Sequence, residues 1–254
     1  MSLTLSDVSH SEAETEARQQ LACAYRLYDH LGWHELIYDH ITVRVPGHDD
    51  QFLINPFGLM YREVRACNLV KIDVEVRIIR PAEHPVNPAG FVVHSAVHAA
   101  RPDGPFRGPH PHTRTTAGQA VACQAQGLLP LSFTAMFFTD RVAYHDFEGI
   151  TLGNDERARL AADLGSSTVM ILRNHGLLSC GPTIADAFFD LYQLQRACEV
   201  QVAAQAGGVA LTLPPHEVAL RSAAQHRAAC ERDVEARLLF DAMTRWMLDK
   251  DAGF

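Results

Sequence analysis

The sequence predicts an α/β protein with a central mixed or antiparallel sheet, helices on both faces and a helical appendage at the C-terminus. Short segments that alternate β-branched and polar residues predict the strands, and longer segments with apolar residues at helical spacing predict the helices. The 254 residues contain no internal repeat, low-complexity tract or linker, and 47% of them are hydrophobic. We therefore expect one domain over residues 1–254, with a core that needs neither disulfides nor a structural metal.

The N-terminal half begins with an expected loose tail at residues 1–10. A capping-box pair, Ser11 and Glu14, predicts the start of a helix that ends at Gly32. Alternating patterns then predict strands at residues 40–45, at 51–61 with a break at Pro56, and at 69–80. Residues 89–100 predict a helix that stops before Pro102.

The C-terminal half continues the alternation of helices and strands. It predicts a helix at 114–127 that Gly127 caps, a strand–turn–strand at 167–181, a long helix at 183–208 with Thr183 as its N-cap, and a last helix from about 215 to 248. The turn between the two strands is Asn174-His175-Gly176.

Composition excludes several classes of function. A formal net charge of −8 and a pI near 5.9 argue against a nucleic-acid partner or an anionic membrane surface. The six cysteines form no C-x-x-C pair, so we expect reduced thiols in a cytoplasmic protein. No apolar run is long enough for a membrane span, and no glycine-rich nucleotide motif occurs.

Three histidines suggest a metal centre. His110 and His112 alternate by two, which places both on one side of an extended segment. His175 follows a strand directly, and three histidines from two strands form a facial set that suits Zn²⁺, Mn²⁺ or Fe²⁺. The prolines that precede His110 and His112 predict a sheet edge or a bulge. The alternative is three unrelated histidines.

Several motifs together resemble the class II aldolase/adducin family, and most closely its adducin-head-like branch. The matching runs lie between about residues 20 and 205 and include "AYRLYDHLGWHELIYDHITVRVPG", "FLINPFGLMYREVRACNLVKID", "AGFVVHSAVHAARPD", "VAYHDFEGI" and "ILRNHGLLSCG". The resemblance implies a three-layer α/β/α sandwich, a homotetramer with sites between subunits, and a divalent metal, Zn²⁺ first, on His110, His112 and His175.

The sequence also departs from that family at informative positions. Gly90 replaces the acidic residue that serves as metal ligand and acid/base in the sugar-phosphate aldolases, and one residue is added after Asp103. The phosphate loops of those enzymes fall on Pro88-Ala89 and Asp39-His40, which lack the phosphate-binding groups. We therefore expect a small-molecule substrate without phosphate.

Other residues are candidates for catalysis or substrate binding. His94 lies one helical turn after Gly90 and is the candidate acid/base, with His98 one turn further on; the alternative is that His94 only packs beneath the metal loop. The resemblance assigns five residues to substrate-facing positions, which are His40, Thr42, Asn55, Gly58 and His145.

Three functions follow from these observations. The first is a metal-dependent lyase, an aldolase or decarboxylase that acts on a small oxo- or hydroxy-acid through a metal-stabilised enolate. The second is a non-haem iron oxygenase, which three histidines with open positions would permit. The third is a non-catalytic assembly module like the adducin head. We favour the lyase, because the three predicted metal ligands are all present.

Overall fold

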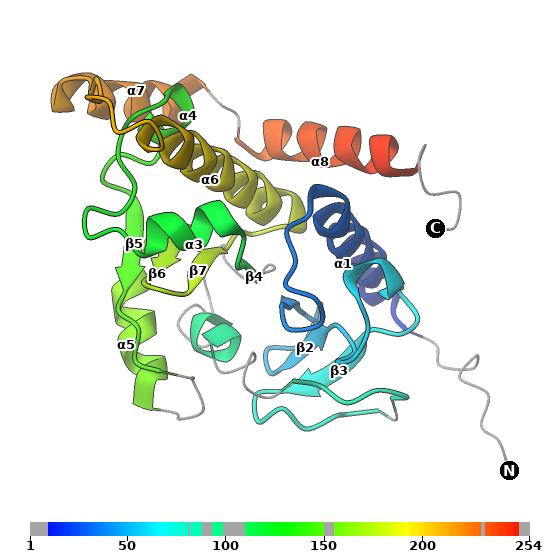
Figure 1. Cartoon of the computed structure of the whole chain (residues 1–254). Helices are drawn as coiled ribbons and strands as arrows, with labels where there is room; N and C mark the ends of the chain where they lie inside the picture. The colour runs from blue at the N-terminus through cyan, green and yellow to red at the C-terminus, as the bar shows by residue number, and fades with distance from the viewer. Residues whose placement is uncertain are drawn as a thin grey trace, which may run out of the picture.

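A seven-stranded mixed sheet forms the middle of the computed structural model, which describes residues 10–80, 82–87, 93–98, 110–149, 155–229 and 232–248 (Figure 1). Its strand order is β3-β2-β1-β4-β7-β6-β5. All neighbours are antiparallel except β5 and β6, which run parallel. The strands are β1 (Ile41–Arg44), β2 (Gln51–Ile54), β3 (Val70–Asp73), β4 (His110–Thr113), β5 (Val142–His145), β6 (Val169–Leu172) and β7 (Gly176–Ser179).

Strand β4 lies in the centre of this sheet and joins its two halves. Residues 110–111 pair with β1, and residues 112–113 pair with β7. Of the two alternatives that the prolines predict, an edge or a bulge, the edge is therefore wrong. A proline lacks the N–H that a ladder uses, and each ladder of β4 spans only two residue pairs, with Pro111 opposite Ile41 on one side only.

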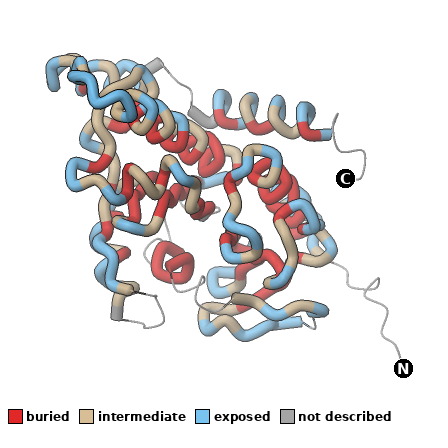
Figure 2. The backbone as a smooth tube through the Cα atoms, in the orientation of Figure 1, coloured by how far each residue is buried: buried red, intermediate tan, exposed pale blue. Residues whose placement is uncertain are grey.

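Helices cover both faces of the sheet. The helices are α1 (Glu12–Leu31), α3 (Thr116–Ala122), α4 (Phe133–Met136), α5 (Asp155–Leu164), α6 (Ile184–Gln205), α7 (His216–Ala229) and α8 (Arg232–Leu248), with a 3-10 turn η2 (Tyr61–Glu63). Helices α1, α3 and α6 pack on one face. Helix α5 and the helical residues 93–98 pack on the other face, where 93–98 are buried throughout (Figure 2). The predicted α/β/α sandwich is thus confirmed.

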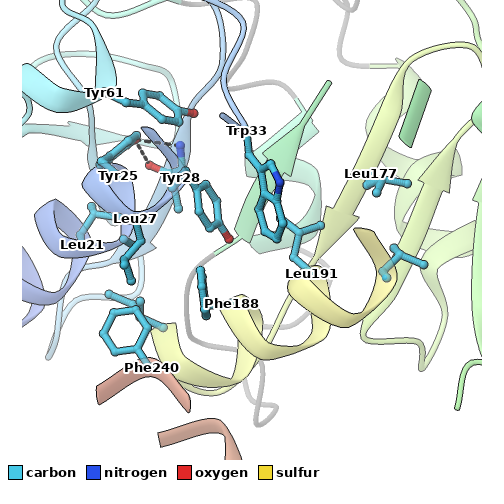
Figure 3. Close-up of a cluster of buried hydrophobic side chains, with 14 of the residues drawn as sticks. Leu21, Tyr25, Leu27, Tyr28, Trp33, Tyr61, Leu177, Phe188, Leu191 and Phe240 are labelled. Carbon is cyan, nitrogen blue, oxygen red and sulfur yellow. Dashed lines mark hydrogen bonds between the residues drawn. The ribbon is translucent and has the colours of Figure 1, made fainter. Parts of the chain in front are cut away.

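Alternation along β6 places its side chains in two different core clusters. In β6, Val169 and Ile171 face α1 and α6, whereas Met170 and Leu172 face α5. On the first side, Tyr28 stacks on Phe188 with ring centroids 5.6 Å apart, and Trp33 packs beside both (Figure 3). These three aromatic residues are therefore core residues.

Several predicted elements need correction. The last helix is two helices, α7 and α8, and residues 230–231 between them lie outside the described part. Helix α3 ends at Cys123, and Gly127 caps no helix; a Cβ there would lie 2.5 Å from the Tyr144 hydroxyl. Helices α4 and α5 and strand β5 were not predicted from the sequence. Of the expected N-terminal tail, only His10 is described.

No helix in the described ranges has both the length and the apolar character that crossing a bilayer requires.

Candidate metal centre

Four histidines from four different segments gather at the middle of the sheet. His40 precedes β1, His94 belongs to the helical residues 93–98, His112 lies in β4, and His175 occupies the β6–β7 turn. The ring centroids of His40 and His94 are 4.4 Å apart, those of His40 and His112 6.0 Å, and those of His112 and His175 4.6 Å. The structure thus brings two of the three predicted metal ligands together with two predicted site residues.

The tight β6–β7 turn brings His175 to His112. Asn174 adopts a positive φ of 56°, which asparagine tolerates better than most residues. Gly176 lies so close to β4 that a Cβ on it would be 2.3 Å from the Thr113 carbonyl oxygen. Only glycine permits this approach, and the approach places the ring of His175 against that of His112.

Burial and neighbouring positive charge keep these two imidazoles neutral. Burial, together with His175, His40 and Arg114, lowers the pKa of His112 well below its usual value. Burial and the Arg114 charge lower the pKa of His175 to about 4. The neutral imidazole is the form that binds metals, so both rings have the right protonation state at neutral pH.

The fit to a metal can be tested on His112. Its Nε2 atom is buried and has no hydrogen-bond partner in the described part of the chain. A buried nitrogen without a partner is costly, and a metal would satisfy it. Among the described side chains, no group of three His, Cys, Asp or Glu could hold a metal ion. The side chain of His110 is not among the described side chains. The backbone of His110, in β4, pairs with Thr42 in β1. Gly90 also lies outside the described residues.

Thr42, in β1 next to β4, contacts the candidate acid/base His94. Its hydroxyl oxygen lies 2.7 Å from His94 Nδ1 and 3.0 Å from His98 Nε2, and all three residues are buried. Because a hydroxyl carries one proton and two lone pairs, it can donate to at most one of the two rings, so at least one ring must donate to it. The tautomers of His94 and His98 are therefore linked through Thr42.

Asn55 and Gly58, two further predicted site residues, lie in different settings. Asn55 is buried; its amide oxygen accepts a hydrogen bond from the Tyr25 hydroxyl at 3.0 Å, and its Nδ2 donates to the Asp39 carbonyl at 3.4 Å. Asn55 therefore braces the segment that precedes β1. Gly58 lies in an exposed turn with a φ of 103°.

His145 lies at the end of β5, where two acidic side chains hold its ring. Nδ1 is 2.7 Å from Asp163 Oδ2, and Nε2 is 3.3 Å from Glu156 Oε1. A cavity of about 10 Å³, large enough for about one water, is lined by His145, Glu156 and His175 among others. The structure thus places His145 on the same small cavity as His175, within its own pair of carboxylates.

Arg114 lies beside the histidines, and the sequence alone did not indicate it as a site residue. Its Nε donates to Asp39 Oδ1 at 2.7 Å, and Asp39 Oδ2 accepts from the Glu35 backbone N–H at 2.8 Å. Burial raises the pKa of Asp39, and the Arg114 charge opposes that rise. The available signal was an arginine two residues after the H-x-H pair; its partner lies 75 residues away.

Comparisons with known proteins agree with this architecture. A Pseudomonas aeruginosa protein whose name refers to the class 2 aldolases is 50% identical over 208 residues, which cover 82% of this chain and 79% of that protein. Mouse alpha-adducin is 45% identical over 206 residues, 79% of this chain but 28% of the adducin. The crystal structure of an aldolase II superfamily protein from Pseudomonas syringae superposes with a TM-score of 0.89 at 44% identity and covers 95% of both chains.

The family match covers most of the sheet and its helices. Residues 19–202, from the middle of α1 to near the end of α6, match the family described as "Class II Aldolase and Adducin N-terminal domain". The predicted resemblance is thereby confirmed: the chain belongs to the class II aldolase and adducin family.

Proposed function

We propose that this protein is a divalent-metal-dependent lyase, an aldolase or decarboxylase, that acts on a small oxo- or hydroxy-acid without phosphate. His110, His112 and His175 would hold the metal, with Zn²⁺ the best match to three neutral nitrogen ligands. The observation that supports this most strongly is the buried Nε2 of His112, which has no partner in the described residues and lies against a second neutral imidazole.

The chemistry divides between the metal and the surrounding side chains. A bound divalent ion supplies Lewis-acid stabilisation of the negative charge that develops on oxygen when the C–C bond breaks. His94 moves the proton, and Thr42 orients its ring through Nδ1, so the transfer would use Nε2. His40 lies between His94 and His112 and lines the path from one to the other.

The surroundings of Asp39 support a substrate without phosphate. Asp39 occupies one of the positions at which the sugar-phosphate aldolases bind phosphate, and its side chain is buried and bonded to Arg114. A carboxylate there provides no hydrogen-bond donor for a phosphate.

The second candidate function is a non-catalytic assembly module, and the 45% identity to alpha-adducin favours it. The two candidates differ in a measurable property, because only the lyase needs an open metal position next to a proton donor.

The experiment uses protein loaded with Zn²⁺, Mn²⁺ or Fe²⁺ and a panel of 2-oxo and hydroxy acids, each beside a phosphorylated analogue. Proton NMR would detect C–C cleavage. We expect cleavage of unphosphorylated acids, its loss in His175→Ala, and full activity in the matched control His48→Ala, an exposed histidine outside the cluster. Metal-loaded protein without cleavage of any acid would favour the assembly module, and oxygen consumption with Fe²⁺ would favour an oxygenase.

A further inference from the structure

We propose that Arg114, which Asp39 holds beside His112 and His175, binds the carboxylate of the substrate. This assignment deepens the proposed function and takes its substrate class, the oxo- and hydroxy-acids, from it. Arg114 is the specificity residue in this account, and Asp39 is the positioning residue.

The backbone places Arg114 next to both histidines. Arg114 directly follows β4 and stands two residues after His112. On the other side, its Cγ lies 3.3 Å from the position that a Cβ on Gly176 would take, and Gly176 is the residue after His175. The aliphatic stem of Arg114 therefore lies across the start of β7, and its charged group stays close to the cluster.

Buried residues fix the guanidinium on one edge only. Nε donates to Asp39 Oδ1 at 2.7 Å; the side chain of Asp39 is 0% exposed, whereas that of Arg114 is 26% exposed. Asn55 binds the Asp39 carbonyl oxygen, and Tyr25 binds Asn55. The positive partner of this ion pair is thus the one that faces outward.

The other edge of the guanidinium can recognise an anion. Neither Nη1 nor Nη2 of Arg114 makes a hydrogen bond to any residue in the ranges that the structure describes. A guanidinium presents these nitrogens as a planar fork that matches both oxygens of a carboxylate.

The position of Arg114 also selects among carboxylic acids. A carboxylate on Arg114 would extend its adjacent carbon toward the histidine cluster, since His112 and His175 are the neighbours of Arg114. An oxygen on that carbon is then the group nearest the metal ligands. This geometry favours 2-oxo and 2-hydroxy acids over acids that carry their oxygen further along the chain.

The test compares two probes of the same shape, pyruvate and pyruvamide, by isothermal titration calorimetry on zinc-loaded and metal-free protein. We expect Arg114→Gln to weaken pyruvate binding by about 10- to 100-fold, the usual effect of losing a charge-assisted hydrogen bond. Pyruvamide binding should stay unchanged. The matched control is Arg196→Gln, which removes an exposed arginine from an ion pair with Glu199 on α6.

Additional variants keep the test informative if Arg114→Gln misfolds. Arg114→Gln leaves Asp39 buried without its partner, so the double variant Asp39→Asn/Arg114→Gln supplies a neutral pair and should show the same loss of pyruvate binding. Arg114→Lys should restore part of the binding, because it keeps the charge but not the fork. Asp39→Asn alone should give a smaller loss than Arg114→Gln.

Three results would overturn the proposal: wild-type protein that binds no pyruvate in either metal state, Arg114 variants that bind pyruvate as wild type does, or an equal loss for pyruvate and pyruvamide. Zinc content and C–C cleavage are measured on the same samples. Arg114-dependent pyruvate binding by protein that takes up no zinc when zinc is supplied would refute the proposed lyase alone. Zinc-dependent cleavage with no role for Arg114 would refute the carboxylate assignment alone.

Discussion

The buried hydroxyl of Thr42 controls two histidines at once. His94 and His98 face it from successive turns of one helix, at 2.7 and 3.0 Å. A threonine in β1 thereby holds the position of the ring that would transfer the proton. The sequence indicated that His94 and His98 share a face, but their common partner lies 52 residues before His94 and could not be predicted.

Replacement of His94 tests its proposed role in proton transfer. His94→Gln keeps a hydrogen-bonding group for Thr42 but cannot titrate, so turnover should fall by roughly 10²–10⁴-fold while bound metal stays at the wild-type level. Steady-state kinetics across pH, together with metal analysis, would check this. Full activity with an unchanged pH profile would show that His94 only packs beneath the cluster.

At the scale of elements, a buried ion cluster attaches α1 to β3. The Glu14 carboxylate bonds Arg18 Nε at 3.0 Å and Lys71 Nζ at 2.6 Å, and all three side chains are almost fully buried. The sequence predicted Glu14 as half of a capping box; Ser11 does cap the Glu14 N–H, but the carboxylate turns to the two cations. Periodicity predicts where α1 begins, and it cannot predict a partner in β3.

Glu14→Gln should lower the free energy of unfolding by about 3 kcal/mol at pH 7, because Arg18 and Lys71 lose their buried counter-charge. Burial opposes ionisation of Glu14, but its bonds to Lys71 and Arg18 outweigh this and lower its pKa below 4.5. The unfolded chain therefore binds the proton more readily, and the stabilisation, complete above pH 4.5, is lost as pH falls through the folded-state pKa.

Urea denaturation between pH 3 and pH 7 would test this prediction. The matched control is Glu16→Gln, an exposed position on the same helix, which should change stability by less than about 0.5 kcal/mol. Equal stability losses in the two variants, or a loss in Glu14→Gln that does not shrink below pH 4.5, would contradict the role of this cluster.

The elements predicted most accurately are those whose sequence pattern lies within a single segment. Helix α6 begins at its Thr183 capping box, and β1 lies within the predicted strand at residues 40–45. The central position of β4 was missed, because proline statistics describe a strand in isolation whereas β4 is held by both halves of the sheet. Arg114 was missed for the same reason, since its ion-pair partner Asp39 lies 75 residues before it.

At the scale of the whole molecule, α8 leaves an apolar surface uncovered. Ala236, Phe240 and Met247 pack inward. The outer face exposes Val234, Leu238, Ala242 and Trp246, although Trp246 also packs on His30 of α1. A contiguous apolar surface of this kind marks an interface. We propose that it contributes to the homotetramer that the family resemblance implies.

Light scattering should therefore give about four times the chain mass of 28.1 kDa. Leu238→Glu places a charge in the exposed apolar face and should shift the population toward smaller species, whereas Arg237→Glu, the neighbouring exposed position, should leave it unchanged. A monomer at working concentrations in wild-type protein would contradict the proposed assembly.

The metal content of protein purified without added metal tests whether the histidine cluster binds a divalent ion. We predict about one divalent ion per chain in wild-type protein and in His48→Ala, and loss of the ion in His175→Ala and His112→Ala with the circular dichroism spectrum preserved, because the core does not depend on the metal. Wild-type protein that binds no divalent ion at micromolar concentrations would contradict the account.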